Sequence, residues 1–151
     1  MAPFNNIDEI LDFAIQNEQN AVDLYTDLAT KATSSAIKAE FEAYANEERG
    51  HKAKLENVKA GKQLLDANTR IQDLKISDYT VDSDLGENPD YQTVLLFAMK
   101  QEKAAFKLYT DLAGMTSDNS VKNLLLGLAQ EEAKHKLRFE MEYDDNVLTE
   151  N

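Results

Sequence analysis

The sequence predicts an all-α protein, a four-helix bundle built from two repeated helical hairpins that are joined by a long crossover. Residues of high helix propensity are abundant, and the 151 residues include only five glycines and two prolines. Apolar residues recur in steps of three and four along four stretches, as they do on the buried face of a helix. A shift of 84 residues aligns the two halves of the chain, so that residues 25–29 repeat as residues 109–113.

Two helices are expected in the first half, at about residues 6–31 and 34–60. The apolar stripe of the first helix is interrupted by one charged residue, Glu18. The stripe of the second is interrupted only by Glu48 and His51, which share a helix face because they are three residues apart. Residues that favour helix starts and turns flank these stretches: Asn5, Asn6, Thr33, Ser34 and Ser35.

The second half repeats the arrangement, with helices expected at about residues 89–115 and 118–143. Glu102 interrupts the apolar stripe of the first of these helices, and Glu132 and His135 interrupt that of the second. His51 and His135 are the only histidines in the chain, and each follows a glutamate by three residues.

The segment at about residues 61–88 has weak periodicity and many turn-forming residues. It is nevertheless too apolar for a free linker, since it contains Leu64, Leu65, Ile71, Leu74, Ile76, Tyr79 and Val81. We therefore expect an ordered crossover that packs on the helices, within a single domain spanning residues 1–151.

The polar interruptions are predicted to meet at one depth in the bundle. Glu18 lies about 15 residues before the turn of its hairpin and Glu48 about 15 residues after it, so both lie about 22 Å from that turn. Glu102 and Glu132 repeat this spacing in the second hairpin. If the hairpins pack face to face, all six polar residues form one layer.

Four buried carboxylates need compensating charge, because removing an ion from water costs several kcal/mol. A set of four glutamates and two histidines suits two divalent first-row ions, with Fe or Mn favoured over Zn. A single Glu-x-x-His pair would more often belong to a solvated surface than to a metal site. The agreement of both hairpins favours a dinuclear centre with ligands Glu18, Glu48, His51, Glu102, Glu132 and His135.

Two further repeated pairs flank these positions. Tyr25 and Tyr109 are expected either to pack in the core or to contact a ligand glutamate through their hydroxyl groups. Glu47 and Glu131 point about 100° away from the apolar stripe, so an exposed or interface role is expected for them.

The composition excludes several classes of function. A formal net charge of −12 argues against binding to nucleic acid or to an anionic membrane surface. The absence of cysteine rules out disulfides, thiolate nucleophiles and iron–sulfur ligation within these residues. The first residues have no basic and apolar leader pattern, and no apolar run is long enough to span a bilayer, so a cytoplasmic protein is expected.

These residues resemble the pattern of the ferritin-like di-iron carboxylate superfamily, and most closely its rubrerythrin-like branch. The resemblance implies a ferritin-like fold and two iron ions, with Glu48 and Glu132 bridging them. It further implies that Glu18 and Glu102 are terminal ligands and that each histidine binds one iron. This sequence departs from the typical rubrerythrin pattern in two ways. It has no cysteine, whereas the rubredoxin module of typical rubrerythrins needs four. It also has Ala105 where rubrerythrins tend to have an additional helix glutamate.

The resemblance implies a di-iron oxidoreductase, a peroxidase or oxidase that reacts with hydrogen peroxide or dioxygen and serves in oxidative stress. Its electrons would come from an external donor, such as a rubredoxin-like protein or a reductase. The alternatives are an iron-binding ferroxidase of the ferritin type and a bundle with empty or zinc-filled sites that serves in interactions. A homodimer is expected, and a ferritin cage is disfavoured because only a short acidic tail is expected after residue 143.

Overall fold

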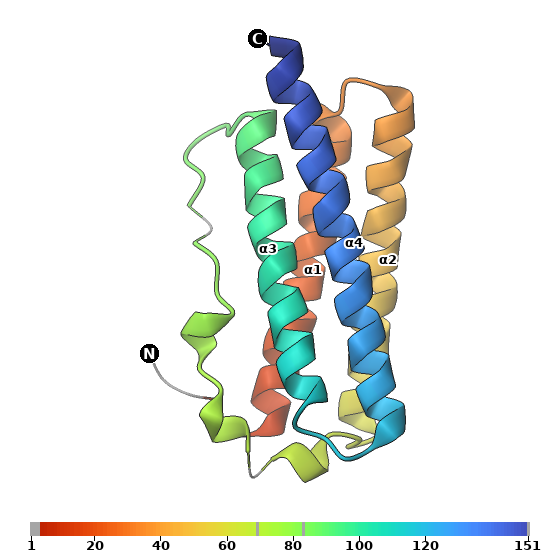
Figure 1. The fold of residues 1–151 in the computed structure, drawn as a ribbon, viewed down its shortest axis with the longest axis vertical. Helices are drawn as coiled ribbons and strands as arrows, with labels where there is room; N and C mark the ends of the chain where they lie inside the picture. Colours follow the sequence, from red (N-terminus) through yellow and green to blue (C-terminus); the bar gives the residue numbers. More distant parts are fainter. Residues whose placement is uncertain (1–3, 69, 83, 151) are drawn as a thin grey trace.

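The structure is a computed structural model that describes residues 4–68, 70–82 and 84–150. Four long helices form the bundle: α1 (Ile7–Lys31), α2 (Ser35–Ala60), α3 (Tyr91–Ala113) and α4 (Asn119–Glu150). They run side by side as two hairpins, α1 with α2 and α3 with α4 (Figure 1). The described residues contain no strand, and the predicted all-α four-helix bundle is confirmed.

The first three helices begin at side chains that accept a backbone hydrogen bond, as helix N-termini require. Asn6 accepts from the backbone N–H of Glu9 at 2.9 Å, and Ser34 caps α2 in the same way. Asp90 accepts from the N–H of Thr93 at 2.8 Å, so α3 starts at Tyr91, just after the expected residue 89.

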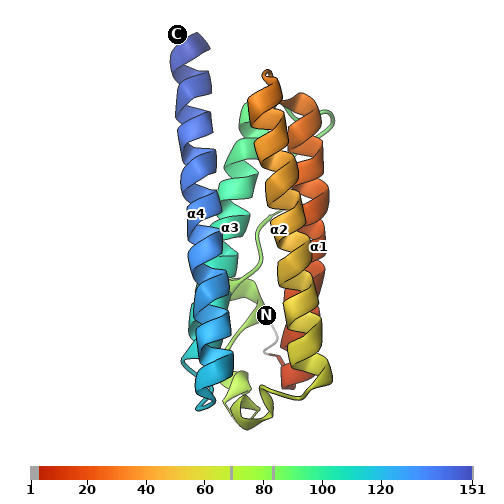
Figure 2. The ribbon, with the colours of Figure 1, turned by 90° about the vertical axis from the view of Figure 1, so that its right-hand side faces the viewer.

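Helix α4 is longer than the sequence pattern indicates. The stretch after residue 143, expected to be a short acidic tail, continues the helix to Glu150. Glu142 is buried near this end, where its carboxylate accepts the Tyr91 hydroxyl at 2.7 Å and the Asn146 amide at 3.1 Å. Figure 2 shows this end of α4 projecting past the other helices. No helix among the described residues is long and apolar enough to cross a membrane.

The crossover returns the chain from one end of the bundle to the other and includes three short 3₁₀ helices (Figure 1). These are η1 (Leu65–Ala67), η2 (Ile71–Asp73) and η3 (Ile76–Asp78). As expected, the segment packs on the helices, although Leu65 is 59% exposed. Its buried side chains are Leu64, Ala67, Ile71, Leu74 and Tyr79. The Tyr79 hydroxyl donates to Asp111 of α3 at 2.7 Å.

The apolar core consists of two clusters, and the polar layer separates them along every helix. One cluster contains residues of α1 up to Ala14 and residues of α2 from Leu55 onward. It also contains the parts of α3 and α4 nearest their connecting turn. The other cluster includes Tyr25, Phe41 and Phe139 at the opposite end of the bundle. The polar residues of the four helices therefore lie between two apolar clusters, which position the candidate site.

Candidate metal centre

Each helix contributes to one buried polar layer, as the repeat predicts. Glu18 comes from α1, Glu48 and His51 from α2, Glu102 from α3, and Glu132 and His135 from α4. None of the six side chains is more than 2% exposed. The structure thus brings together all six residues that the sequence singles out.

The layer forms two groups of donor atoms, and in each group the atoms lie within 4.8 Å of one another. Glu48 and Glu132 belong to both groups. Glu18 and His51 complete the first group, and Glu102 and His135 complete the second. This arrangement matches two adjacent metal positions that share two carboxylates.

The hydrogen bonding of the layer tests whether the residues fit metal ions. Nδ1 of His51 is 2.7 Å from Glu132, and Nδ1 of His135 is 2.9 Å from Glu48, yet neither nitrogen has a hydrogen-bond partner in the described structure. Buried carboxylate oxygens without a partner lie beside them, on Glu18, Glu48, Glu102 and Glu132.

Buried Glu142 provides the contrast, because its carboxylate is satisfied by hydrogen-bond donors. Buried polar atoms normally have such partners, and unpaired ones cost free energy. Buried carboxylate and imidazole atoms that converge and lack hydrogen-bond partners can be satisfied by a cation that displaces their protons, so the donor set fits bound metal ions.

The outer nitrogen of each histidine is held by a carboxylate from the opposite hairpin. Nε2 of His135 on α4 contacts the Glu47 carboxylate of α2 at 2.5 Å. Nε2 of His51 on α2 contacts the Glu131 carboxylate of α4. A carboxylate at Nε2 fixes the proton there and leaves the Nδ1 lone pair directed at the layer.

Glu47 and Glu131 are partly exposed, as expected, but the sequence did not predict their contacts with the histidines of the opposite hairpin. The side chains of Glu47 and Glu131 are 45% and 47% exposed and lie off the apolar stripe. Each one contacts a histidine of the other hairpin. The repeated Glu-Glu doublet was a usable signal, whereas the contact between hairpins could not be deduced from the geometry of one helix.

In the absence of cations the layer retains protons. Burial and the neighbouring Glu48 raise the pKa of Glu18 to about 8, and burial raises the pKa of Glu102 to about 8. Burial would lower the pKa of His51, but its contacts with Glu132 and Glu18 raise the pKa above its usual value. Metal binding must therefore displace protons from these groups.

The two equivalent tyrosines lie beside the layer in different ways. The Tyr109 hydroxyl donates a hydrogen bond to Glu18. The hydroxyl of Tyr25 is buried without a partner in the described structure, and its ring lies edge-on to His135 with centroids 6.2 Å apart. The expected tyrosine contact with a glutamate of the layer is therefore present at Tyr109 only.

A second difference between the two candidate metal positions comes from Tyr44. Its ring stacks on His135 with centroids 4.2 Å apart and an interplanar angle of 27°. The repeat places Leu128 at the equivalent position of the other hairpin. Consequently, the two histidines have different neighbours although their carboxylate partners are equivalent.

A small cavity of about 20 Å³ adjoins the layer between α1 and α3. Ala21 and Ala105 line it, together with the polar side chains of Asn17 and Gln101. Its size corresponds to about one water molecule. Ala105 thus leaves space beside Glu102 where a longer side chain would fill it.

Comparison with known proteins agrees with this geometry. The rubrerythrin family model matches residues 9–143, which is most of the chain. This chain belongs to the rubrerythrin family. Searches of curated proteins and of solved structures found no match. Membership of the rubrerythrin family and the buried carboxylate–histidine layer together point to a di-iron protein.

Proposed function

We propose that this rubrerythrin-family protein is a di-iron oxidoreductase that reduces hydrogen peroxide, with dioxygen as a second possible oxidant. Glu18 and His51 would hold one iron, Glu102 and His135 the other, and Glu48 and Glu132 would bridge them. The supporting observation is the set of converging, unpartnered donor atoms shared between two four-residue groups. Bound iron would supply the electron-transfer chemistry.

The donor types favour iron among the available metals. Carboxylate oxygens and imidazole nitrogens suit Fe(II), Mn(II) and Zn(II), and the chain offers no thiolate for a soft metal. Four carboxylates would balance two divalent ions in charge. Only the redox-active candidates would turn over an oxidant, so metal content and reactivity must be measured on the same sample.

The protein's own residues would provide geometry, hydrogen bonds and exclusion of water. Glu47 and Glu131 would keep both histidines oriented with Nδ1 toward the metals. Tyr109 would hold Glu18 in place through its hydrogen bond. Burial raises the pKa of Tyr109, so the Tyr109 hydroxyl stays protonated and remains a hydrogen-bond donor.

The cavity beside Ala105 would admit the oxidant. Its volume of about 20 Å³ suits a molecule of very few atoms. Asn17 and Gln101 line the cavity and can form hydrogen bonds, which favours hydrogen peroxide over apolar dioxygen.

Iron reconstitution tests the proposal. Protein loaded anaerobically with Fe(II) should bind two ions per chain and should be oxidised by one equivalent of hydrogen peroxide faster than by dioxygen in stopped-flow absorbance. A Glu48→Ala, Glu132→Ala double variant that retains its helical circular dichroism should bind no iron pair. A diferrous protein inert to both oxidants would contradict the proposed activity.

Iron uptake also separates this proposal from a ferritin-type ferroxidase. A storage protein would take up many more than two ions per chain and assemble as a cage. We also propose that the protein is a homodimer. The molar mass from light scattering of the purified protein distinguishes a dimer from a cage.

A further inference from the structure

The candidate metal layer is buried, so an oxidant must pass between helices to reach it. None of the six side chains of the layer is more than 2% exposed. The cavity of about 20 Å³ beside the layer lies at the seam between α1 and α3. These two helices belong to different hairpins, and most contacts between helices lie within a hairpin. The seam is therefore packed less closely than either hairpin.

A second space, which we call the outer pocket, opens on the same seam and has a volume of about 290 Å³. Asn20, Ala21 and Leu24 line it from α1, and Phe97 and Gln101 line it from α3. Ala21 and Gln101 also line the cavity beside the layer. Since Asn20 is exposed, the two spaces form one path from solvent to the layer, and this path narrows at Ala21 and Gln101.

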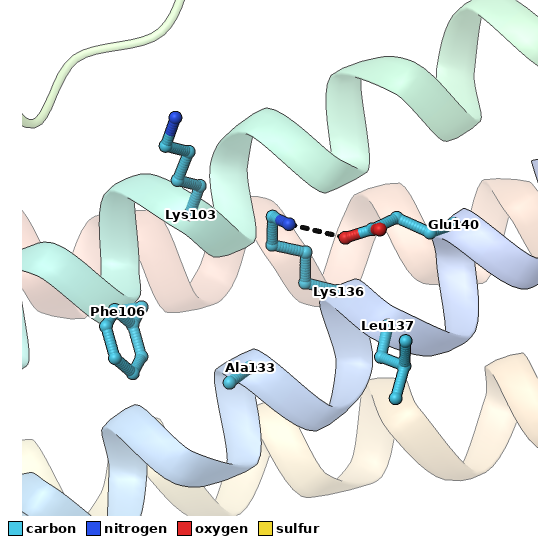
Figure 3. A pocket seen from close by; sticks show the side chains of 6 residues that line it. All are labelled: Lys103, Phe106, Ala133, Lys136, Leu137 and Glu140. Atoms are coloured by element: carbon cyan, nitrogen blue, oxygen red, sulfur yellow. Dashed lines mark hydrogen bonds and ion pairs between the residues drawn. The ribbon is translucent and has the colours of Figure 1, made fainter.

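A larger groove on another face has no such connection. It lies between α3 and α4 and has a volume of about 550 Å³ (Figure 3). None of the residues that line this groove also lines the cavity beside the layer. The groove carries charge as well, in the pair formed by Lys136 and Glu140 (Figure 3). Volume alone therefore does not indicate the way to the metals.

The repeat of the chain provides an internal comparison for the outer pocket. The shift of 84 residues relates Leu24 and Phe97 to Leu108 and Phe13. At this equivalent place Leu108 is only 2% exposed, and Phe13 packs edge-on against Phe4 with ring centroids 5.4 Å apart. Buried residues of the crossover belong to the same apolar cluster. One end of the seam is thus filled, whereas the other end keeps the outer pocket.

The lining of the path favours neutral molecules of few atoms. None of the five residues that line the outer pocket is charged, although 29% of the residues of the chain are. An ion in this pocket would lose water without gaining a charged partner, and such a loss costs several kcal/mol. Beyond Ala21 and Gln101, a cavity of about 20 Å³ has room for about one water-sized molecule but not for a branched organic group.

We propose that the outer pocket is the entrance for the oxidant and that Ala21 and Gln101 form the constriction that selects it, a proposal that rests on the proposed oxidoreductase function. Small neutral oxidants would pass, and anionic or branched ones would not. Hydrogen peroxide meets both conditions. Its O–O bond would break as two bound Fe(II) ions each supply one electron, and two protons would complete two molecules of water. tert-Butyl hydroperoxide is neutral but branched, so it would be held back in the outer pocket.

Stopped-flow oxidation of the diferrous protein tests the constriction. Ala21→Leu should narrow the path and slow the reaction with hydrogen peroxide by at least about tenfold. Gln101→Ala should widen it and raise the rate with tert-butyl hydroperoxide, relative to that with hydrogen peroxide, by about tenfold. Ala53→Leu makes the same change at an exposed position of α2 and should leave both rates within about twofold. The iron content of each variant reports the metal layer separately.

Thiol labelling of metal-free protein tests the entrance without iron or oxidant. The chain has no cysteine, so Ala21→Cys and the control Ala53→Cys each supply a single thiol. Neutral methyl methanethiosulfonate should modify both variants, as measured by mass spectrometry. The anionic sulfonatoethyl reagent should react at least about tenfold more slowly with Ala21→Cys than with Ala53→Cys, because its charge disfavours entry into an uncharged pocket.

Three results would overturn the proposed entrance. One is an unchanged rate with hydrogen peroxide in an Ala21→Leu variant of normal iron content. Another is wild-type protein that reacts with tert-butyl hydroperoxide as fast as with hydrogen peroxide. The third is equal labelling of Ala21→Cys and Ala53→Cys by the anionic reagent. Diferrous wild-type protein that is inert to both oxidants would instead contradict the proposed function, and the labelling of metal-free protein would still decide whether the entrance exists.

Discussion

Glu47 of α2 accepts a hydrogen bond from His135 of α4, so a residue of one hairpin orients a candidate metal ligand of the other. Glu131 does the same for His51 in the opposite direction. Neither hairpin therefore carries a complete histidine position, and the metal layer depends on the pairing of both.

Removing one of these carboxylates should weaken metal binding. Glu47→Ala leaves the Nε2 proton of His135 without an acceptor, and loss of such an orienting partner typically costs about 10- to 100-fold in metal affinity. Competition titration with Co(II) and a chelator measures the affinity. Glu47→Gln should lose less because its amide oxygen can still accept, and the exposed Glu42→Gln should lose nothing. Equal affinities for Glu47→Ala and wild type would contradict the orienting role.

The ring of Tyr44 should affect one metal position more than the other. Tyr44→Leu removes the stack on His135, whereas Tyr44→Phe retains it. We expect a Co(II) titration of the leucine variant to separate into two steps, with the weaker step reduced about tenfold, because an unsupported imidazole is less well oriented. The phenylalanine variant should titrate like wild type. Two equally weakened steps in the leucine variant would argue against a local effect.

Replacing a candidate ligand should weaken metal binding but stabilise the metal-free protein. In metal-free protein Glu102 is a buried carboxyl with an unpartnered oxygen, and an unsatisfied buried polar group costs about 1–3 kcal/mol that an apolar side chain of similar size avoids. Glu102→Met should raise the unfolding temperature of chelator-treated protein and lower the bound iron from two ions to one or none. Glu56→Met on the exposed face of α2 is the matched control. A destabilised Glu102→Met protein would show that the carboxyl is better satisfied than its contacts indicate.

The stability of the metal-free protein should fall as pH rises from about 5 to 8. The folded-state pKa of Glu18 and of Glu102 is about 8, above the usual 4.5, so the folded protein binds more protons than the unfolded chain in this range. Each such proton corresponds to about 1.4 kcal/mol per pH unit. The histidines act in the same direction above their usual pKa of 6.5, because their folded-state pKa is also raised.

Thermal unfolding of chelator-treated protein across this pH range measures the effect. A Glu18→Gln, Glu102→Gln variant should show a flatter dependence, since it lacks the two carboxyls that gain protons. Metal-loaded protein should show the opposite trend, because its ligands have already lost their protons. A metal-free protein with constant stability from pH 5 to pH 8 would contradict the raised pKa values.

The sequence predicted the bundle and the six-residue layer because both depend on periodicity within single helices. A charged residue inside an apolar stripe is visible without a structure, and the equal spacing in both hairpins sets the depth. Contacts between hairpins follow a different rule. The reach of Glu47 to His135 and the stack of Tyr44 depend on the rotation of one helix against another, which no spacing along the chain determines.

The sequence pattern also predicts an α4 that ends too early, at about residue 143 instead of Glu150. The acidic stretch after residue 143 lacks an apolar stripe, yet the helix continues to Glu150, and buried Glu142 accepts hydrogen bonds from Tyr91 and Asn146 near this end. The exposure of Leu65 shows the same limitation in the crossover, where apolar character alone did not indicate which side chain faces the core.

The repeat has a consequence for how the chain folds. Most contacts between helices lie within a hairpin, and contacts of short sequence separation form quickly. Each hairpin can therefore form early, and the closing of one hairpin on the other over the carboxylates comes last. In a chain without metal that last step brings together four acids, whereas available cations would favour it. The supply of metal to a newly made chain would then govern its maturation as well as its chemistry.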